Sequence, residues 1–275
     1  MSLTTRRDFL AMAGGGAVAL TAPGRPFGSR QLPGHAGKGV AAPSDIPFAS
    51  VMAIAAHPGD AFFSMGAPVA LATHAGGQGW FLSLSLGEKG SPKIPLDKYG
   101  AAQHQAAEKA AALLRTKALF LPYPDAEIPI NDEAKFAVCD LIREYKPATV
   151  VTHWKGSWHK DHRASHNIVE DAIFYAGLST IIRKDPAHVV SKLYYADNWE
   201  DADGFVPDTY LDVTAVFDVW VSACSLFPMW RGENGFRYSD YYTSLAILRG
   251  CTSNSQRAVS LMSPPEQKTQ LVRVP

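Results

Sequence analysis

The sequence predicts an α/β domain in which a mostly parallel sheet is covered by helices on both faces. Three observations support this class. The chain has 275 residues, of which 47% are hydrophobic and 19% charged, and this composition suits one domain with a full core. From residue 45 onward, short apolar runs alternate with longer segments that have helical character. The repeated strand–helix–strand order implies right-handed βαβ units.

Five strands and four helices alternate as far as residue 197. The predicted strands are 49–56, 79–87, 118–123, 148–154 and 191–197. The predicted helices between them are 63–76, 101–115, 132–145 and 162–177. We therefore expect a Rossmann-like, three-layer α/β/α domain with a mostly parallel sheet.

Local features justify these elements in chain order. The first strand is the apolar run ASVMAIAA, and the helix after it stops at Gly76 and Gly77. The strand GWFLSLSLG is followed by an Ala-rich helix with high intrinsic propensity. ALFLPY forms the third strand, and the next helix has apolar residues at helical spacing, namely Phe136, Val138, Leu141 and Ile142. ATVVTHW and SKLYYAD form the last two strands, on either side of the fourth helix.

The overall charge and the cysteines exclude several classes of protein. Lys and Arg together number 26, as do Asp and Glu, so the formal net charge is zero. Such a chain is not expected to bind nucleic acid or an anionic membrane surface. Cys139, Cys224 and Cys251 lack CxxC spacing, so we expect small buried residues rather than a zinc ribbon or redox motif. A disulfide between two of them stays open if the chain is exported.

The N-terminal segment TTRRDFLAMAGGGAVALTAPG resembles a twin-arginine (Tat) export signal. Arg6 and Arg7 precede Asp-Phe-Leu and an apolar stretch that is too short for a comfortable membrane span. We expect residues 1–42 to be this signal and a linker, and residues 45–275 to form the domain. The expected partner is then the Tat export machinery, and the location periplasmic or extracellular, with no stable membrane span in the mature chain. The alternative is a tail whose arginines adjoin by chance.

Residues with chemical potential follow several predicted strands at their carboxyl ends. They are His57 and Asp60 after the first strand, Glu88 after the second, Asp125 after the third, and His153, Trp154, His159, Asp161 and His162 after the fourth. Ligands bind beyond the carboxyl ends of the strands in sheets of this kind. One rim of the sheet is therefore expected to hold most of the chemistry.

The histidines on this rim suggest a metal site. The stretch 152–167, THWKGSWHKDHRASHN, holds four of the nine histidines of the chain. Two imidazoles and a carboxylate suit Zn²⁺ and leave one coordination position open for water. A metal held in this way supports hydrolysis of a carbonyl compound. The alternatives are that Asp161 caps the helix that begins there, and that the histidines decorate a surface.

AHPGD after the first strand, joined to HKDHRA at the later helix start, resembles the PIG-L/LmbE family of zinc-dependent N-deacetylases. The motifs of that family usually read AHPDDE and HPDHRA. The segments SLGEKG (85–90), LFLPYPDAEIP (119–129) and DVTAVFDVWVSACSLF (212–227) resemble other parts of the family, so the resemblance covers about residues 48–255.

The resemblance implies a ligand set and roles for neighbouring residues. His57, Asp60 and His162 would hold one Zn²⁺ per chain, with another divalent transition metal as the alternative. His159 would stabilise a tetrahedral oxyanion as a charged donor, and Asp161 would orient a neighbouring histidine or ligand.

The sequence departs from the family pattern at three places. Gly59 stands where the family has its general-base aspartate, and Ala61 replaces the final glutamate of the motif. The stretch 103–105, Gln-His-Gln, stands where family members often carry a substrate-contacting arginine. Loss of a general base typically costs about 10²–10⁴-fold in rate. Glu88 or Asp161 is expected to replace it, with Glu88 slightly favoured.

Four residues are candidates for substrate contacts. Trp154 and Trp158 flank the metal loop and could stack on a sugar ring, while Arg163 could bind an anionic group or simply be solvated. Asp125 lies in the loop after the third strand. We expect an exported hydrolase that removes an acyl group, such as acetyl, from a small N-acylated amino sugar, glycoconjugate or related amide. The alternatives are a catalytically impaired metal- and carbohydrate-binding protein, which Gly59 favours, and an ester hydrolase.

Overall fold

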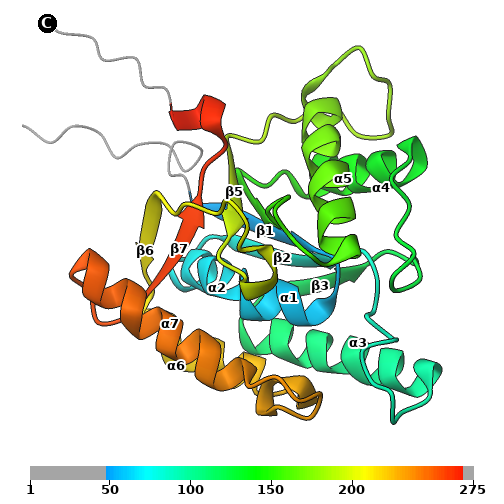
Figure 1. Cartoon of the computed structure of the whole chain (residues 1–275). Helices are drawn as coiled ribbons and strands as arrows, with labels where there is room; N and C mark the ends of the chain where they lie inside the picture. The colour runs from blue at the N-terminus through cyan, green and yellow to red at the C-terminus, as the bar shows by residue number, and fades with distance from the viewer. Residues whose placement is uncertain (1–47, 269–275) are drawn as a thin grey trace, which may run out of the picture. The chain divides into compact units, whose positions relative to one another are not determined.

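The computed structural model describes residues 48–268, and the expected export signal lies outside them. In this part of the chain, seven strands form one sheet in the order β3-β2-β1-β4-β5-β7-β6 (Figure 1). The strands are β1 (Ser50–Ala55), β2 (Gln78–Ser83), β3 (Lys117–Phe120), β4 (Thr149–Thr152), β5 (Lys192–Ala196), β6 (Thr209–Asp212) and β7 (Ala258–Met262). The first five run parallel to one another, while β7 is antiparallel to both β5 and β6.

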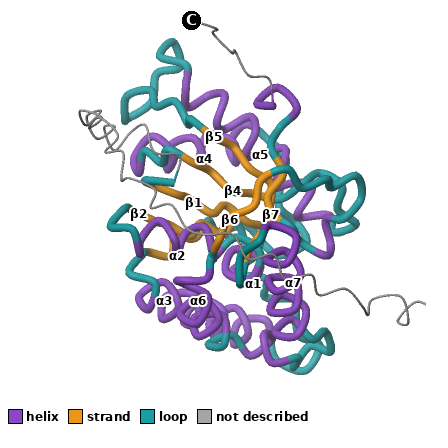
Figure 2. The backbone as a smooth tube through the Cα atoms, turned by 90° about the vertical axis from the view of Figure 1, so that its left-hand side faces the viewer, coloured by secondary structure: helices purple, strands orange, loops and turns teal. Residues whose placement is uncertain are grey.

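Helices cover both faces of this sheet, as Figure 2 shows. One face packs against α4 (Asp132–Tyr145) and α5 (Lys160–Gly177). The other packs against α1 (Pro58–Phe63), α2 (Gly66–His74), α3 (Leu96–Leu113), α6 (Phe217–Cys224) and α7 (Tyr238–Ser253). Short 3₁₀ helices complete the described part, namely η2 (Trp199–Asp201), η3 (Thr214–Val216), η4 (Pro228–Arg231) and η5 (Pro265–Lys268).

Burial on both faces of the sheet explains why the sequence of the central strand β1 is apolar at every position. Val51 and Ala53 join the core under α1 and α2, whereas Met52 and Ile54 join the core under α4 and α5. Successive side chains of a strand point to opposite faces, so a strand covered on both faces is apolar at every position. This burial fixes β1 in the middle of the sheet.

The predicted fold class is confirmed, with local differences in the helices. The predicted helix 63–76 corresponds to α2, and the short helix α1 before it was not predicted; α1 begins at Pro58, whose fixed φ suits the first helical position. The Ala-rich helix begins earlier than expected, at Leu96. The antiparallel pair β6 and β7 and the long helix α7 were not predicted.

The cysteines and the helices bear on two further expectations. Cys139 and Cys224 are buried free thiols, as expected, but Cys251 is exposed on α7, so the expectation of burial is wrong there. Within residues 48–268, we find no helix that combines the length and the hydropathy needed to cross a membrane.

The strand order places the functional rim at the centre of the sheet. From β1 the chain continues outward through β2 and β3, whereas β4 and β5 lie on the other side of β1. The connections that leave β1 and β4 therefore diverge, which opens a crevice beyond the carboxyl ends of these neighbouring strands. His57 follows β1 and His153 follows β4, so both lie at this crevice.

Candidate metal centre

The first part of the site is the start of α1. His57 is the N-cap residue, with extended backbone angles of φ −131° and ψ 160°, and Pro58 begins the helix. Asp60 lies in the first turn, and its Oδ2 is 3.0 Å from His57 Nδ1. The two side chains therefore point toward each other from one helical turn.

The second part is the start of α5, which β4 delivers to the same crevice. His159 is the N-cap residue there, and its Nδ1 accepts a hydrogen bond from the Asp161 amide at 3.2 Å. His159, rather than Asp161, thus caps the helix. His162 is buried in the first turn, and its Nε2 is 3.2 Å from Asp60 Oδ2. The Asp60 carboxylate therefore contacts one imidazole from each helix start.

A buried carboxylate from a third segment orients His162. Asp201, in η2 after β5, places Oδ1 2.8 Å from His162 Nδ1 and Oδ2 2.8 Å from His153 Nδ1. His153 Nε2 accepts the Ala56 amide hydrogen at 3.1 Å, so its own proton lies on Nδ1. Because His162 Nδ1 donates to Asp201, it is Nε2 that faces Asp60 and that would offer a lone pair to a metal once its proton is displaced. Within the described residues this Nε2 is buried and has no hydrogen-bond partner.

Two carboxylates orient the His57 ring in a similar way. His57 Nε2 is 3.1 Å from Asp125 Oδ1 and 3.4 Å from Asp161 Oδ2. Asp125 is fixed by the Lys89 amide at 2.9 Å, and Asp161 by the Ala126 amide at 2.5 Å. Proton donation from Nε2 to these carboxylates leaves Nδ1 toward Asp60, where it would offer a lone pair to a metal once its own proton is displaced.

The donor atoms of His57, Asp60 and His162 fit a transition-metal site. One donor atom from each lies within 4.8 Å of the others. A tetrahedral zinc with bonds of 2.0–2.2 Å separates its ligand atoms by roughly 3.3–3.6 Å. The observed Nδ1–Oδ2 and Nε2–Oδ2 distances are 3.0 and 3.2 Å. Small outward movements would therefore admit the ion.

Two other groups of side chains could also hold a metal, but their atoms are engaged. They are His57, His159 and Asp161, and His153, His162 and Asp201. In the second group, both ring nitrogens of His153 already have partners, as do both Asp201 oxygens. In the first group, His159 Nδ1 accepts the Asp161 amide hydrogen. The ligand set expected from sequence therefore uses the least engaged atoms.

The electrostatics of the site favour positive charge between the carboxylates. Burial opposes ionisation of His162, but Asp60 and Asp201 outweigh it and raise its pKa to about 10. Burial likewise opposes ionisation of His57, but Asp125, Asp161 and Asp60 raise its pKa well above the usual value. Burial opposes ionisation of Asp60 as well, and His162 still holds its pKa well below the usual range. A divalent cation would satisfy the same carboxylates as these protons.

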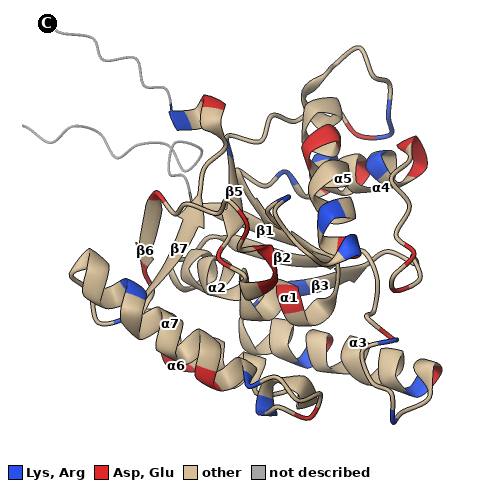
Figure 3. Ribbon diagram, in the orientation of Figure 1, with Lys and Arg blue, Asp and Glu red and all other residues tan. Residues whose placement is uncertain are grey.

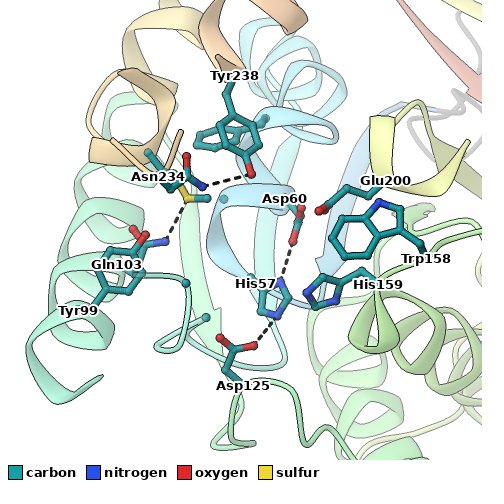
Figure 4. Close-up of a pocket in the computed structure, with 15 residues that line it drawn as sticks. His57, Asp60, Tyr99, Gln103, Asp125, Trp158, His159, Glu200, Asn234 and Tyr238 are labelled. Atoms are coloured by element: carbon teal, nitrogen blue, oxygen red, sulfur yellow. Dashed lines mark hydrogen bonds and ion pairs between the residues drawn. The ribbon is translucent and has the colours of Figure 1, made fainter. Parts of the chain in front are cut away.

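A cavity of about 210 Å³ opens beside these residues (Figure 4). Figure 4 shows Gln103, Tyr99, Asn234 and Tyr238 on one side, opposite His57, Asp60, Asp125, His159, Glu200 and Trp158. Gly59, Phe63, Gly87, Gly90 and Met229 complete the lining. None of the described residues that line the cavity is Lys or Arg. Acidic residues gather instead around α1 and η2 (Figure 3).

The structure separates the four candidate substrate residues into two pairs. Asp125 and Trp158 line the cavity, and Trp158 is 64% exposed at its edge. Trp154 instead packs against Tyr195, and its Nε1 donates to the Asp203 carbonyl at 2.8 Å. Arg163 donates to the Ser157 and Trp158 carbonyls, so it braces the metal loop. Substrate contacts by Trp154 and Arg163 stay predictions that the cavity lining does not support.

Glu88 is occupied within the loops that surround His57. Its Oε1 accepts the Asp125 amide hydrogen at 2.8 Å, and its Oε2 is 3.4 Å from the Ser85 hydroxyl. The adjacent Gly87 has φ +65°, and a Cβ there would lie 3.2 Å from the His57 Cβ. This turn therefore braces His57, and the expected proton-transfer role of Glu88 remains a prediction.

Sequence reasoning missed Glu200 and Asp201, which follow β5 on the same rim. Glu200 lines the cavity, and its Oε2 is 3.5 Å from His162 Nε2. Burial, and next the Asp60 charge, raise the pKa of Glu200 to about 7. The rule that pointed to the ends of the first four strands would have found both residues at the end of the fifth.

His159 differs from the charged donor that the family resemblance implied. Burial, and then the positive charges of His162 and His57, lower its pKa to about 4. It is therefore neutral near pH 7. Because its Nδ1 accepts from the Asp161 amide, the proton lies on Nε2, which leaves a neutral N–H donor on a ring that lines the cavity.

Gly59 lies at the cavity beside a methionine from a distant segment. A Cβ built on Gly59 would be 2.9 Å from the Met229 Sδ and 3.3 Å from the Phe63 ring. Met229 belongs to η4, and its sulfur accepts a weak hydrogen bond from Gln103 Nε2 at 3.4 Å. The thioether thus takes up the space that a side chain at position 59 would need.

Comparisons with known proteins support this fold, and the family match covers the two helix starts that carry His57, Asp60 and His162. The family model for GlcNAc-PI de-N-acetylases, PIG-L, matches residues 52–173, which confirms the expected resemblance. The 4-oxalmesaconate hydratase of Pseudomonas putida is 23% identical over 220 residues, covering 75% of this chain and 81% of that protein.

Solved structures share the fold. A 4-carboxy-2-hydroxymuconate hydratase from Pseudomonas putida superposes with a TM-score of 0.73 at 22% identity, covering 82% of this chain and 99% of that one. The N,N'-diacetylchitobiose deacetylase from Pyrococcus horikoshii gives 0.67 at 18% identity, covering 79% and 84%. Proteins that share this fold are thus named as hydratases and as deacetylases.

Proposed function

We propose that this chain, a PIG-L/LmbE-like protein in sequence and fold, is a metal-dependent hydrolase that removes an acyl group, such as acetyl, from an N-acylated amino sugar or related amide. The observation that carries the proposal is the state of His162 Nε2. This atom is buried, forms no hydrogen bond of good geometry within the described residues, and lies 3.2 Å from Asp60 Oδ2 and 3.5 Å from Glu200 Oε2, two carboxylates that line the cavity. A metal ligand is the role that such an atom fits best.

His57, Asp60 and His162 would hold the metal, and Zn²⁺ suits their nitrogen and oxygen donors. Once bound, the ion would act as a Lewis acid that activates water and polarises the acyl carbonyl. Asp201 and Asp125 keep the two imidazole rings in the ligating tautomer through their outer nitrogens.

Two residues at the cavity can move or donate protons. Glu200 is the best-placed carboxylate for the work that Gly59 cannot do, because it lines the cavity 3.5 Å from the ligating nitrogen of His162. It would take a proton from the attacking water and deliver one to the leaving amine. His159 would donate its Nε2–H to the developing oxyanion, as a neutral donor.

A hydratase is a second candidate, because the curated relative from Pseudomonas putida carries that name. The names of that relative and of the solved hydratase denote carboxylated compounds. The cavity described here is lined by Asp60, Asp125 and Glu200, with no Lys or Arg among its described lining residues. A carboxylated substrate would therefore lack a cationic partner other than the metal, which favours the deacetylase.

Acetate release from N-acetylglucosamine derivatives tests the proposal. Zinc-loaded protein should release acetate, and His162→Ala protein should not. The same preparations should be offered 4-carboxy-2-hydroxymuconate, with hydration followed by loss of ultraviolet absorbance. Hydration without acetate release would replace the proposal with the second candidate, and bound zinc with neither reaction would favour the catalytically impaired carbohydrate-binding alternative.

We also propose export by the twin-arginine pathway, on the basis of Arg6 and Arg7, the Asp-Phe-Leu that follows them and the short apolar stretch after it. Residues 1–42 lie outside the described part of the chain. Fusion of these residues to a reporter that functions only after export should give a signal that Arg6→Lys with Arg7→Lys abolishes. A signal that persists in the double variant would contradict this assignment.

A further inference from the structure

Asn198 is a buried asparagine between the metal centre and the segment that follows β5. It is 2% exposed and is the N-cap residue of η2. Its side-chain Oδ1 accepts the Glu200 amide hydrogen at 3.0 Å, and its main-chain oxygen accepts the Asp201 amide hydrogen at 3.0 Å. Asn198 therefore holds the backbone of the two acidic residues whose side chains lie against His162.

The other end of the Asn198 amide lies against an expected metal ligand. Its Nδ2 donates to Asp60 Oδ1 at 3.4 Å. The partners fix the orientation of this amide, because exchanging its nitrogen and oxygen would set the oxygen against the Asp60 carboxylate and the NH₂ group against the Glu200 N–H. Asn198 thus joins Asp60 on α1 to η2, although the two residues are 138 positions apart in the chain.

The two carboxylate oxygens of Asp60 have different partners. Oδ2 is 3.0 Å from His57 Nδ1 and 3.2 Å from His162 Nε2, the two nitrogens that would bind the metal. Oδ1 contacts the Asn198 amide instead. A carboxylate can bind a metal through one oxygen or through both, and a tetrahedral site that keeps a position open for water requires the first mode. A hydrogen bond to Oδ1 favours this mode, because it engages the second oxygen.

Capping of η2 does not by itself require an asparagine at position 198. Serine and aspartate cap helices about as well as asparagine does. Aspartate would bring a second carboxylate against Asp60, and serine lacks the amide nitrogen. Asparagine combines an acceptor for the cap with a neutral N–H donor at the end of the same side chain. The donor, rather than the cap, is therefore the feature that relates Asn198 to the metal centre.

We propose that Asn198 is a positioning residue of the metal centre. Its Nδ2 holds Asp60 Oδ1, so that Asp60 offers only Oδ2 to a metal, while its two oxygens fix η2. One residue then sets Asp60, Glu200 and Asp201 relative to one another. The inference rests on the ligand set of the proposed function, and it goes further by assigning a role to a residue that is not itself a ligand.

Metal affinity tests this role without relying on turnover. Asn198→Ser keeps an oxygen that can cap η2 and removes the amide donor, whereas Asn198→Ala removes both. The matched controls are Asn131→Ser and Asn131→Ala, because the exposed Asn131 caps α4 in the same way, with Oδ1 2.9 Å from the Ala134 amide. We expect zinc affinity, measured by competition with a chromogenic chelator, to fall about tenfold or more in both Asn198 variants. Both Asn131 variants should keep the native affinity.

The visible spectrum of the cobalt-loaded protein gives a second readout, which a purely structural role of Asn198 would not change. Four-coordinate Co²⁺ absorbs visible light more strongly than Co²⁺ with five or six ligands. Once the donor is lost, Asp60 can bind through both oxygens. The absorption of cobalt-loaded Asn198→Ser should therefore be weaker than that of native protein.

Native zinc affinity or a native cobalt spectrum in Asn198→Ser would overturn the proposed role. Loss of affinity in Asn198→Ala alone would overturn it as well, because the cap would then be the feature that matters. So would an equal loss in the Asn131 variants. Zinc binding that depends on Asn198, without acetate release, would overturn only the proposed hydrolysis, whereas no zinc binding by native protein would overturn both.

Discussion

Asp201 Oδ1 lies 2.8 Å from His162 Nδ1 in the buried floor of the site. This contact fixes which ring nitrogen of His162 is free to bind a metal, because the other nitrogen is committed to the carboxylate. The other Asp201 oxygen makes an equal contact with His153. The metal-binding state of His162 therefore depends on a carboxylate 39 residues further along the chain.

Replacement of Asp201 by asparagine should weaken metal binding. The asparagine amide has one acceptor oxygen, so it cannot accept hydrogen bonds from both imidazoles, and the orientation of His162 is weakened. We expect zinc affinity to fall about 10–100-fold, as measured by competition with a chromogenic chelator. Asp203→Asn is the matched control, because Asp203 is exposed two residues away. Equal affinity of Asp201→Asn and native protein would contradict the role given to Asp201.

Metal binding should release protons at neutral pH. The raised pKa values of His162 and His57 keep these rings protonated at pH 7 in the metal-free chain, because neighbouring carboxylates outweigh the effect of burial. A metal must displace these protons, so zinc affinity should rise with pH between about pH 6 and pH 9. Calorimetric titrations in buffers of different ionisation enthalpy would count the protons. A heat that is the same in every buffer would contradict the prediction.

Glu200→Gln and Glu88→Gln should have different effects. Because Glu200 lines the cavity, its replacement should reduce kcat about 10²–10⁴-fold while zinc content stays at the native level. Glu88 accepts the Asp125 amide, so its replacement should mainly lower the free energy of unfolding. Acetate release by zinc-loaded protein and urea denaturation separate the two effects. Loss of turnover in Glu88→Gln alone would restore Glu88 as the proton-transfer residue.

A side chain at position 59 should conflict with Met229. Gly59→Asp would place its Cβ 2.9 Å from the Met229 sulfur, and we expect it to destabilise the fold by about 1–3 kcal/mol. The double variant with Met229→Ala should be less affected than the sum of the two single changes, since the space is then free. A double-mutant cycle in urea measures this coupling. Strict additivity would mean that the two positions do not compete for space.

The meeting of His57, Asp60 and His162 on one rim could be predicted from sequence because they lie in two short stretches. His57 and Asp60 share one helical turn after β1, and His162 lies in the first turn after the loop that follows β4. Parallel strands bring such stretches to one rim. The choice of these three residues as the metal ligands came from the family resemblance and stays a prediction.

The residues that sequence reasoning missed depend on tertiary contacts. The end of the predicted fifth strand would have placed Asp201 and Glu200 on the rim, but their contacts with His162 depend on the pairing of β5 with β4, and their local sequence NWED has no recognisable spacing. Met229 lies against Gly59 from the 3₁₀ helix η4. The sequence predicted no helix or strand at this position.

The most direct test of the central claim is the position of the bound metal. Anomalous scattering at the zinc edge, from crystals of zinc-loaded protein, locates the ion without reference to activity. We predict one peak about 2.0–2.2 Å from His57 Nδ1, Asp60 Oδ2 and His162 Nε2. A peak among His153, His162 and Asp201, or no peak in fully loaded crystals, would contradict it.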